Sequence, residues 1–156
     1  MLDIDSLKNG LKKEDKDKIN KSLTELGLLN PTGLESQEQA LNMIVDECHG
    51  RARQAGWFTN LETGQELERN VPEMLCLIHS EISEAMEGYR KNLNDTHLTE
   101  RSMIEVELAD AIIRIADLAG YLKLDLGGAY KEKLLYNANR EDHKIENRLK
   151  GDGKKF

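Results

Sequence analysis

Apolar residues recur at intervals of three and four along most of this chain, and that repeat restricts its fold more than any other feature. Such intervals place side chains on one face of an α-helix. Proline, which interrupts helices, occurs only twice in 156 residues, and aromatic residues make up 4%. Both values favour helix over sheet. The sequence therefore predicts an all-α protein, built as an antiparallel helical bundle.

Turn and capping residues give the expected ends of the helices. Beyond a helical arm, four helices are expected, over residues 36–56, 72–91, 99–122 and 125–140. Pro72 suits the first turn of the second helix, where proline is favoured, and Thr99 can cap the third. Asn30-Pro31-Thr32-Gly33 indicates a turn before the first helix. The predicted parts are a helical arm at 1–35, a helical bundle at 36–145 and a basic, flexible tail at 146–156.

The charge of the chain limits its partners. Its 29 acidic and 22 basic residues give a net charge of −7, which disfavours DNA and RNA because phosphate contacts need clustered Lys and Arg. A small polyphosphate can still bind where metal ions bridge it to carboxylates. The N-terminus has no apolar signal core, and no apolar run reaches membrane-spanning length. We therefore expect a soluble cytoplasmic protein (host cytoplasm if viral) with no membrane partner, and Cys48 and Cys76 as buried, reduced thiols.

Two acidic pairs are the strongest candidates for chemistry. Glu81 and Glu84 are three residues apart, as are Glu107 and Asp110, so each pair projects from one face of its helix. Each pair lies about two turns from the loop between the second and third helices, and a short loop makes such helices antiparallel neighbours. The four carboxylates are then expected to meet in one groove, where they repel one another unless cations neutralise them. Oxygen ligands of this kind suit Mg2+, with Mn2+ as a substitute.

The alternative is that these acids face solvent, as most charged residues do. The same spacing also occurs by chance at Glu84 and Glu87. The flanking sequence favours a buried site, because residues 74–78 are apolar almost all round, and residues 111–119 are apolar except for Arg114 and Asp117. Acids inside such helices must be paired or must bind metal.

Further polar residues could complete a site. Asp117 lies seven residues after Asp110, so it is a candidate for metal or substrate contact, or the partner of a basic residue. Arg114, between them, could pair with an acid. Candidate phosphate ligands follow at the helical positions i, i+4 and i+7, namely Lys133, Asn137 and Arg140. A solvated helix face is the alternative for that stripe.

Taken together, these motifs resemble the MazG-like, all-α nucleoside triphosphate pyrophosphohydrolases. The family hallmark is ExxE, a spacer and ExxD, and here 22 residues separate Glu84 from Glu107. The phrases LIHSEISEAMEGYR (77–90) and ELADAIIRIADLAG (107–120), the basic stripe and the terminal GDGKKF all resemble the family. The likeness covers about residues 38–156. Ser80 departs from it, because many members have a second acid at that position.

The resemblance implies a fold, a reaction and roles for residues. It implies that water attacks the α-phosphate of a (deoxy)nucleoside triphosphate, giving the monophosphate and pyrophosphate; some viral members select deoxynucleotides such as dGTP. The four acids would hold two or three Mg2+ ions. Glu84 is the candidate catalytic base, and the stripe of Lys133, Asn137 and Arg140 would position phosphates. A homodimer or homotetramer is expected, as in related proteins.

Other functions fit the same residues. A dUTPase or a phosphoribosyl-ATP-type pyrophosphohydrolase would use the same carboxylates, and a non-enzymatic helical interaction module would leave them solvated. Trp57 follows the first helix, where an exposed aromatic ring can stack on a nucleobase. It could equally fill the bundle or a subunit interface.

Overall fold

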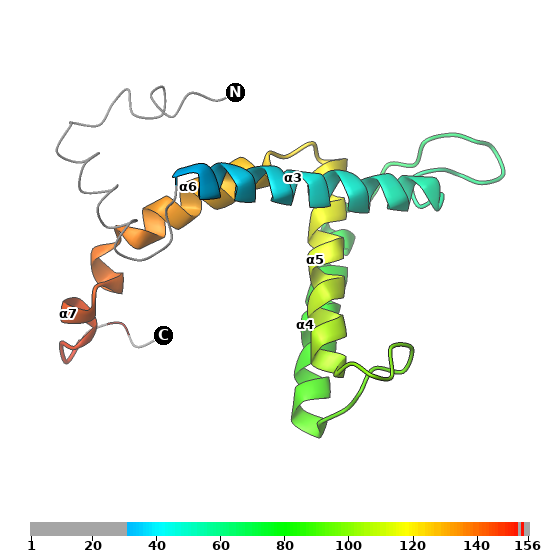
Figure 1. The fold of residues 1–156 in the computed structure, drawn as a ribbon. Helices are drawn as coiled ribbons and strands as arrows, with labels where there is room; N and C mark the ends of the chain where they lie inside the picture. Colours follow the sequence, from blue (N-terminus) through cyan, green and yellow to red (C-terminus); the bar gives the residue numbers. More distant parts are fainter. Residues whose placement is uncertain (1–30, 153, 155–156) are drawn as a thin grey trace. The chain divides into compact units, whose positions relative to one another are not determined.

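The regular elements in the described part of the chain are all helices, in agreement with the predicted all-α class. The structure, a computed structural model, describes residues 31–152 and 154. Its helices are α3 (Pro31–Gln54), α4 (Val71–Lys91), α5 (Met103–Tyr121), α6 (Leu126–Ala138), the 3-10 helix η1 (Glu141–His143) and α7 (Ile145–Arg148) (Figure 1). Strands are absent from these residues, which contain only two isolated β-bridges, Thr59 to Glu66 and Asn94 to Ser102. The predicted arm at 1–35 falls almost wholly outside the described residues.

Two helix ends and the C-terminal tail differ from the prediction. Helix α3 begins at Pro31 rather than at Ser36, because the proline that was read as a turn signal suits the first turn of a helix. Helix α5 begins after Ser102 rather than after Thr99. Glu105 Oε2 accepts hydrogen bonds from the backbone nitrogen of Ser102 at 3.0 Å and from its hydroxyl at 2.9 Å, which is a capping box. Beyond α6, the predicted flexible tail contains part of α7.

The described residues divide into two compact units, residues 31–40 with 127–152 and 154, and residues 41–126. In the described part of the first unit, a buried ion pair joins α3 to α6. Lys131 Nζ donates to Glu38 Oε2 at 2.7 Å, and both side chains are largely shielded from solvent. None of the helices in the described residues is long and apolar enough to cross a membrane.

The second unit is built around a hairpin of α4 and α5, which lie side by side (Figure 1). Asn70 caps α4, its side chain accepting a hydrogen bond from the backbone nitrogen of Glu73. At the other end Asn92 has φ of 52° and closes the helix in the left-handed region, which asparagine tolerates. Asn70 and Asn92 therefore fix the two ends of α4, and the short loop after Asn92 leads directly into the antiparallel α5.

The core of this unit includes two small clusters of buried residues. One cluster joins Val45 of α3 to Ala116 and Ala119 of α5. The other joins Phe58 to Met74 and Leu118, and Phe58 is only 2% exposed. Both clusters hold the C-terminal half of α5, so they fix its orientation beside α3 and α4.

Several apolar residues that recur at helical spacing are exposed, although such a repeat predicts a buried face. They are Leu75, Ile82, Met86 and Tyr89 on α4, and Leu108, Ile112 and Ile115 on α5. Cys76, expected to be buried, is exposed too. The buried positions of α4 are Met74, Glu81, Ala85 and Gly88. A Cβ at Gly88 would lie 2.8 Å from Met103 Cβ, so the small residues on this face let α4 and α5 approach closely.

Candidate metal centre

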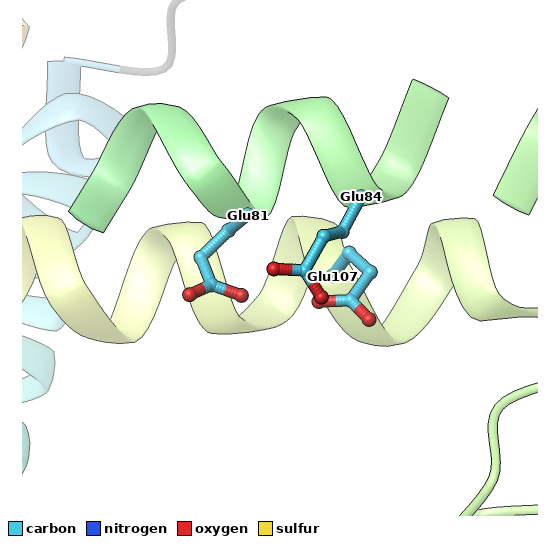
Figure 2. A group of neighbouring side chains, drawn as sticks. All are labelled: Glu81, Glu84 and Glu107. Carbon is cyan, nitrogen blue, oxygen red and sulfur yellow. The ribbon is translucent and has the colours of Figure 1, made fainter. Parts of the chain in front are cut away.

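Three of the four predicted metal ligands converge between α4 and α5 (Figure 2). Glu81 and Glu84 extend from α4, and Glu107 extends from α5 to meet them. Each contributes a carboxylate oxygen to a group in which all the atoms lie within 4.8 Å of one another. The expectation that the two acidic pairs sit at the same height in the hairpin is therefore confirmed for these three acids.

Two of the three acids are buried, which is unusual for carboxylates. Glu81 is 6% exposed and Glu107 is 7% exposed, whereas Glu84 is open to solvent. Burial raises the pKa of Glu107 to about 7, assisted by a hydrogen bond to Glu81 and by the charges of Glu84, Glu81 and Asp110. Negative charges this close disfavour full ionisation. The cluster is therefore poised to bind either protons or cations near neutral pH.

Arg114 of α5 supplies a positive charge to the cluster. Its Nε donates a hydrogen bond to Glu81 Oε1 at 2.6 Å, and the two side chains form an ion pair. The sequence had left open whether Arg114 pairs with an acid, and it does. The pairing offsets part of the cost of burying the Glu81 carboxylate.

Asp110 lies beside this cluster but outside the group of three. It follows Glu107 by one turn on α5, is partly buried, and its charge helps to raise the pKa of Glu107. Carboxylate oxygens are the ligands that Mg2+ and Mn2+ prefer. The donor set of Glu81, Glu84 and Glu107, with Asp110 nearby, therefore fits a hard divalent cation.

Asp117 faces α3 instead of the cluster. Its Oδ1 lies 2.8 Å from Nδ1 of His49, and both side chains are mostly buried. Of the two roles considered for Asp117, pairing with a basic residue is the one that the structure describes.

His49 itself was not foreseen as a partner of Asp117. Its ring meets that of Phe58 edge-on, with centroids 4.8 Å apart. The backbone of Gly120 approaches so closely that a Cβ there would lie 2.4 Å from His49 Cβ. Val45, Cys48, His49 and Ala52 share one face of α3 at helical spacing, so the position of His49 could have been inferred from that repeat.

The predicted phosphate-binding stripe is not continuous. Helix α6 ends at Ala138, so Arg140 lies beyond it and no longer shares a helical face with Lys133. Lys133 Nζ lies over the ring of Tyr136, 4.7 Å from its centroid, and Arg140 pairs with Asp142. Asn137 Oδ1 is buried and, among the described residues, has no hydrogen-bond partner. The stripe and the acidic cluster belong to different compact units.

Trp57 is 64% exposed in the loop after α3. The neighbouring Phe58, rather than Trp57, fills the core of this unit. Among the described residues Trp57 therefore does not fill the bundle, and the two other roles considered for it, stacking on a nucleobase or filling a subunit interface, both use an exposed ring.

Comparison with known proteins assigns no relatives, because no protein family, curated protein or solved structure matches this chain. The likeness to MazG-like pyrophosphohydrolases consequently rests on the residues quoted from the sequence, and it stays a prediction.

Proposed function

We propose that this chain is a divalent-metal-dependent nucleotide pyrophosphohydrolase of the MazG-like type. The observation that carries the proposal is the group of carboxylate oxygens from Glu81, Glu84 and Glu107, all within 4.8 Å of one another. Two of these acids are nearly inaccessible to water, and burying several carboxylates together is costly unless a cation binds them. The motif likeness supplies the substrate class, a (deoxy)nucleoside triphosphate.

In this reaction water attacks the α-phosphorus, a new bond forms between the water oxygen and that phosphorus, and the bond to the bridging oxygen breaks. The products are the nucleoside monophosphate and pyrophosphate. Bound Mg2+ would supply positive charge that activates the water and offsets charge on the phosphates. Glu81 and Glu107 are suited to holding the ion, because they are buried and fixed by both helices.

Glu84 is the residue proposed to accept the proton from water. It is the exposed member of the group, so solvent and substrate can reach it. A carboxylate on the open side of the cluster can both contact the ion and take a proton. Lys133, Asn137 and Arg140 remain proposed phosphate ligands, and Asp117 and Trp57 proposed substrate contacts, all from the sequence.

A homo-oligomer, dimer or tetramer, is part of the proposal. Exposed apolar residues recur along α4 at positions 75, 82, 86 and 89, and along α5 at positions 108, 112 and 115. Ile82 and Leu108 each follow a buried glutamate by one residue, whereas Glu84 and Asp110 follow the same glutamates by three. Because α4 and α5 are antiparallel, Ile82 and Leu108 lie on one side of the two helices, and Glu84 and Asp110 lie on the other side. One side of the hairpin is therefore acidic and the other apolar, and a second copy would cover the apolar side.

The test is hydrolysis of a panel of nucleoside and deoxynucleoside triphosphates with Mg2+, followed by product analysis. We expect pyrophosphate and monophosphate from at least one of them. E81Q and E107Q should each lower turnover by more than about 100-fold, since each removes a charged ligand but keeps the shape of the side chain. E87Q is the matched control, because Glu87 lies on the same helix but pairs with Arg90 and Lys91 instead.

Two results would overturn the proposal. Release of orthophosphate from every triphosphate would exclude this reaction. Absence of both turnover and divalent-ion binding, with E81Q indistinguishable from the wild type, would favour the interaction module. Activity restricted to dUTP or to a phosphoribosyl nucleotide would keep the metal site but select one of the narrower alternatives.

A further inference from the structure

Arg114 brings a positive charge to Glu81, one of the three glutamates that the proposed metal ion would contact. We propose that Arg114 is the counter-cation of the metal-free site, and that a divalent ion must displace its guanidinium from Glu81 to bind fully. The inference rests on the proposed function, because it requires a metal ion at the three glutamates. It adds a role for a residue that the motifs do not include.

The two side chains of this ion pair differ in their freedom to move, because Glu81 is buried and Arg114 is partly exposed. Glu81 has a side chain only 8% exposed, whereas the side chain of Arg114 is 43% exposed. Arg114 follows Glu107 by seven residues, two turns along the same face of α5, and reaches across to α4. The guanidinium can therefore withdraw into solvent while keeping its charge hydrated, but the carboxylate cannot follow it.

The two cations cannot share Glu81 without cost. Glu81 Oε1 accepts the hydrogen bond from Arg114, and Glu81 also takes a hydrogen bond from Glu107. A divalent ion among the three carboxylates would lie within a few ångströms of the guanidinium, where like charges repel. Binding the ion therefore includes the loss of the Arg114–Glu81 pair. Arg114 therefore balances the charge of Glu81 when metal is scarce, and it raises the metal concentration needed to fill the site.

A purely orienting role for Arg114 predicts the opposite effect on metal binding. If the guanidinium only held Glu81 in the geometry that the ion needs, its loss would weaken binding, as the loss of residues supporting metal ligands usually does. If it competes with the ion, its loss tightens binding. The sign of the change in affinity therefore separates the two roles.

The experiment compares the wild type with R114M, R114K and R90M by calorimetric titration with Mg2+ and Mn2+. We expect R114M to bind either ion roughly three- to five-fold more tightly, which corresponds to the upper part of the range for losing a partly exposed ion pair. R114K keeps a cation and should stay within about two-fold of the wild type. R90M is the matched control, since Arg90 pairs with Glu87 on α4, outside the cluster, and its loss should leave the affinity unchanged.

Thermal unfolding gives a second readout on the same proteins. Without metal, R114M should melt below the wild type, because three close carboxylates lose their counter-cation. Saturating Mg2+ should then raise its melting temperature by more than it raises that of the wild type. A structural role alone would lower both melting temperatures equally and leave the gain unchanged.

A measurement on the wild type covers the case in which R114M does not fold. The side-chain Nε–H resonance of Arg114, assigned by its absence in R114K, should shift during Mg2+ titration with the calorimetric midpoint. A resonance that stays fixed while the ion binds would overturn the inference and leave the proposed function intact, as would weaker binding by R114M. A wild type that binds no divalent ion would overturn both.

Discussion

Glu107 of α5 donates a hydrogen bond to Glu81 of α4, so two buried carboxyl groups on different helices are in direct contact. Such a contact forms only when one of the two carries a proton. With burial and the charges of neighbouring acids, it raises the pKa of Glu107 to about 7. In the metal-free protein this proton reduces the repulsion between the carboxylates, as a bound metal ion would. Protons and metal ions therefore compete for Glu107.

Metal affinity should consequently depend on pH around neutrality. Protonated Glu107 must lose its proton to become a ligand, so Mg2+ binding should tighten by about ten-fold between pH 6 and pH 8. Calorimetry in buffers of different ionisation enthalpy should detect release of up to about one proton per site at pH 6. E87Q should keep this dependence. Affinity that is constant over this range would show that Glu107 is not a ligand.

Without metal, rising pH should reduce the contribution of Glu107 to stability, whereas the same rise in pH should strengthen metal binding. Since the folded-state pKa of Glu107 is raised above its usual 4.5, the folded protein holds a proton that the unfolded chain has lost. The stabilisation is complete below pH 4.5 and is lost as pH rises through about 7, with a total of roughly 1–3 kcal/mol. In EDTA, the difference in unfolding free energy between wild type and E107Q should therefore change over this window and be constant above it.

Close packing between α3 and α5 gives a prediction about stability alone. A Cβ at Gly120 would lie 2.4 Å from His49 Cβ, so G120A must push α3 away from α5 and disturb the contact of His49 with Asp117. We expect the unfolding free energy to fall by about 1–3 kcal/mol, measured by denaturant titration. G50A is the matched control: no atom lies within 4 Å of a Cβ there, so it should stabilise α3 by about 0.5–1 kcal/mol. Equal effects of the two would contradict this packing.

The acidic cluster could be predicted because its information is local. Glu81 and Glu84 are separated by one turn, and the short loop after α4 brings Glu107 to the same height. The pairing of His49 with Asp117 spans 68 residues. The repeat on α3 shows that His49 faces inward, but its partner depends on how α3 packs against α5, which no local repeat specifies. The prediction that Lys133, Asn137 and Arg140 share one helical face was wrong, because α6 ends at Ala138.

The buried face of α4 does not follow from hydrophobicity alone. Hydrophobicity identifies the side of a helix that avoids water, and on α4 that side contains Ile82, Met86 and Tyr89. The face that packs against α5 is made of Glu81, Ala85 and Gly88, whose burial follows from small size and from the needs of a charged site. An apolar face that its own chain leaves exposed indicates contact with something else.

That exposed face leads to the last prediction, which concerns assembly. Met86 is 65% exposed and Ile112 is 54% exposed, each in the middle of its stripe. If a second copy covers them, a buried charge at either position would cost several kcal/mol per subunit and separate the copies. M86E and I112E should therefore shift the mass measured by light scattering to that of the monomer, 17.7 kDa. L61E is the matched control, since Leu61 is 82% exposed in the loop after α3, and it should leave the mass unchanged.

Variants that keep the wild-type mass, or a wild type that is already monomeric, would exclude this face as the contact between copies. Divalent-ion binding by the separated M86E monomer would further show that the acidic side of the hairpin binds metal without the partner.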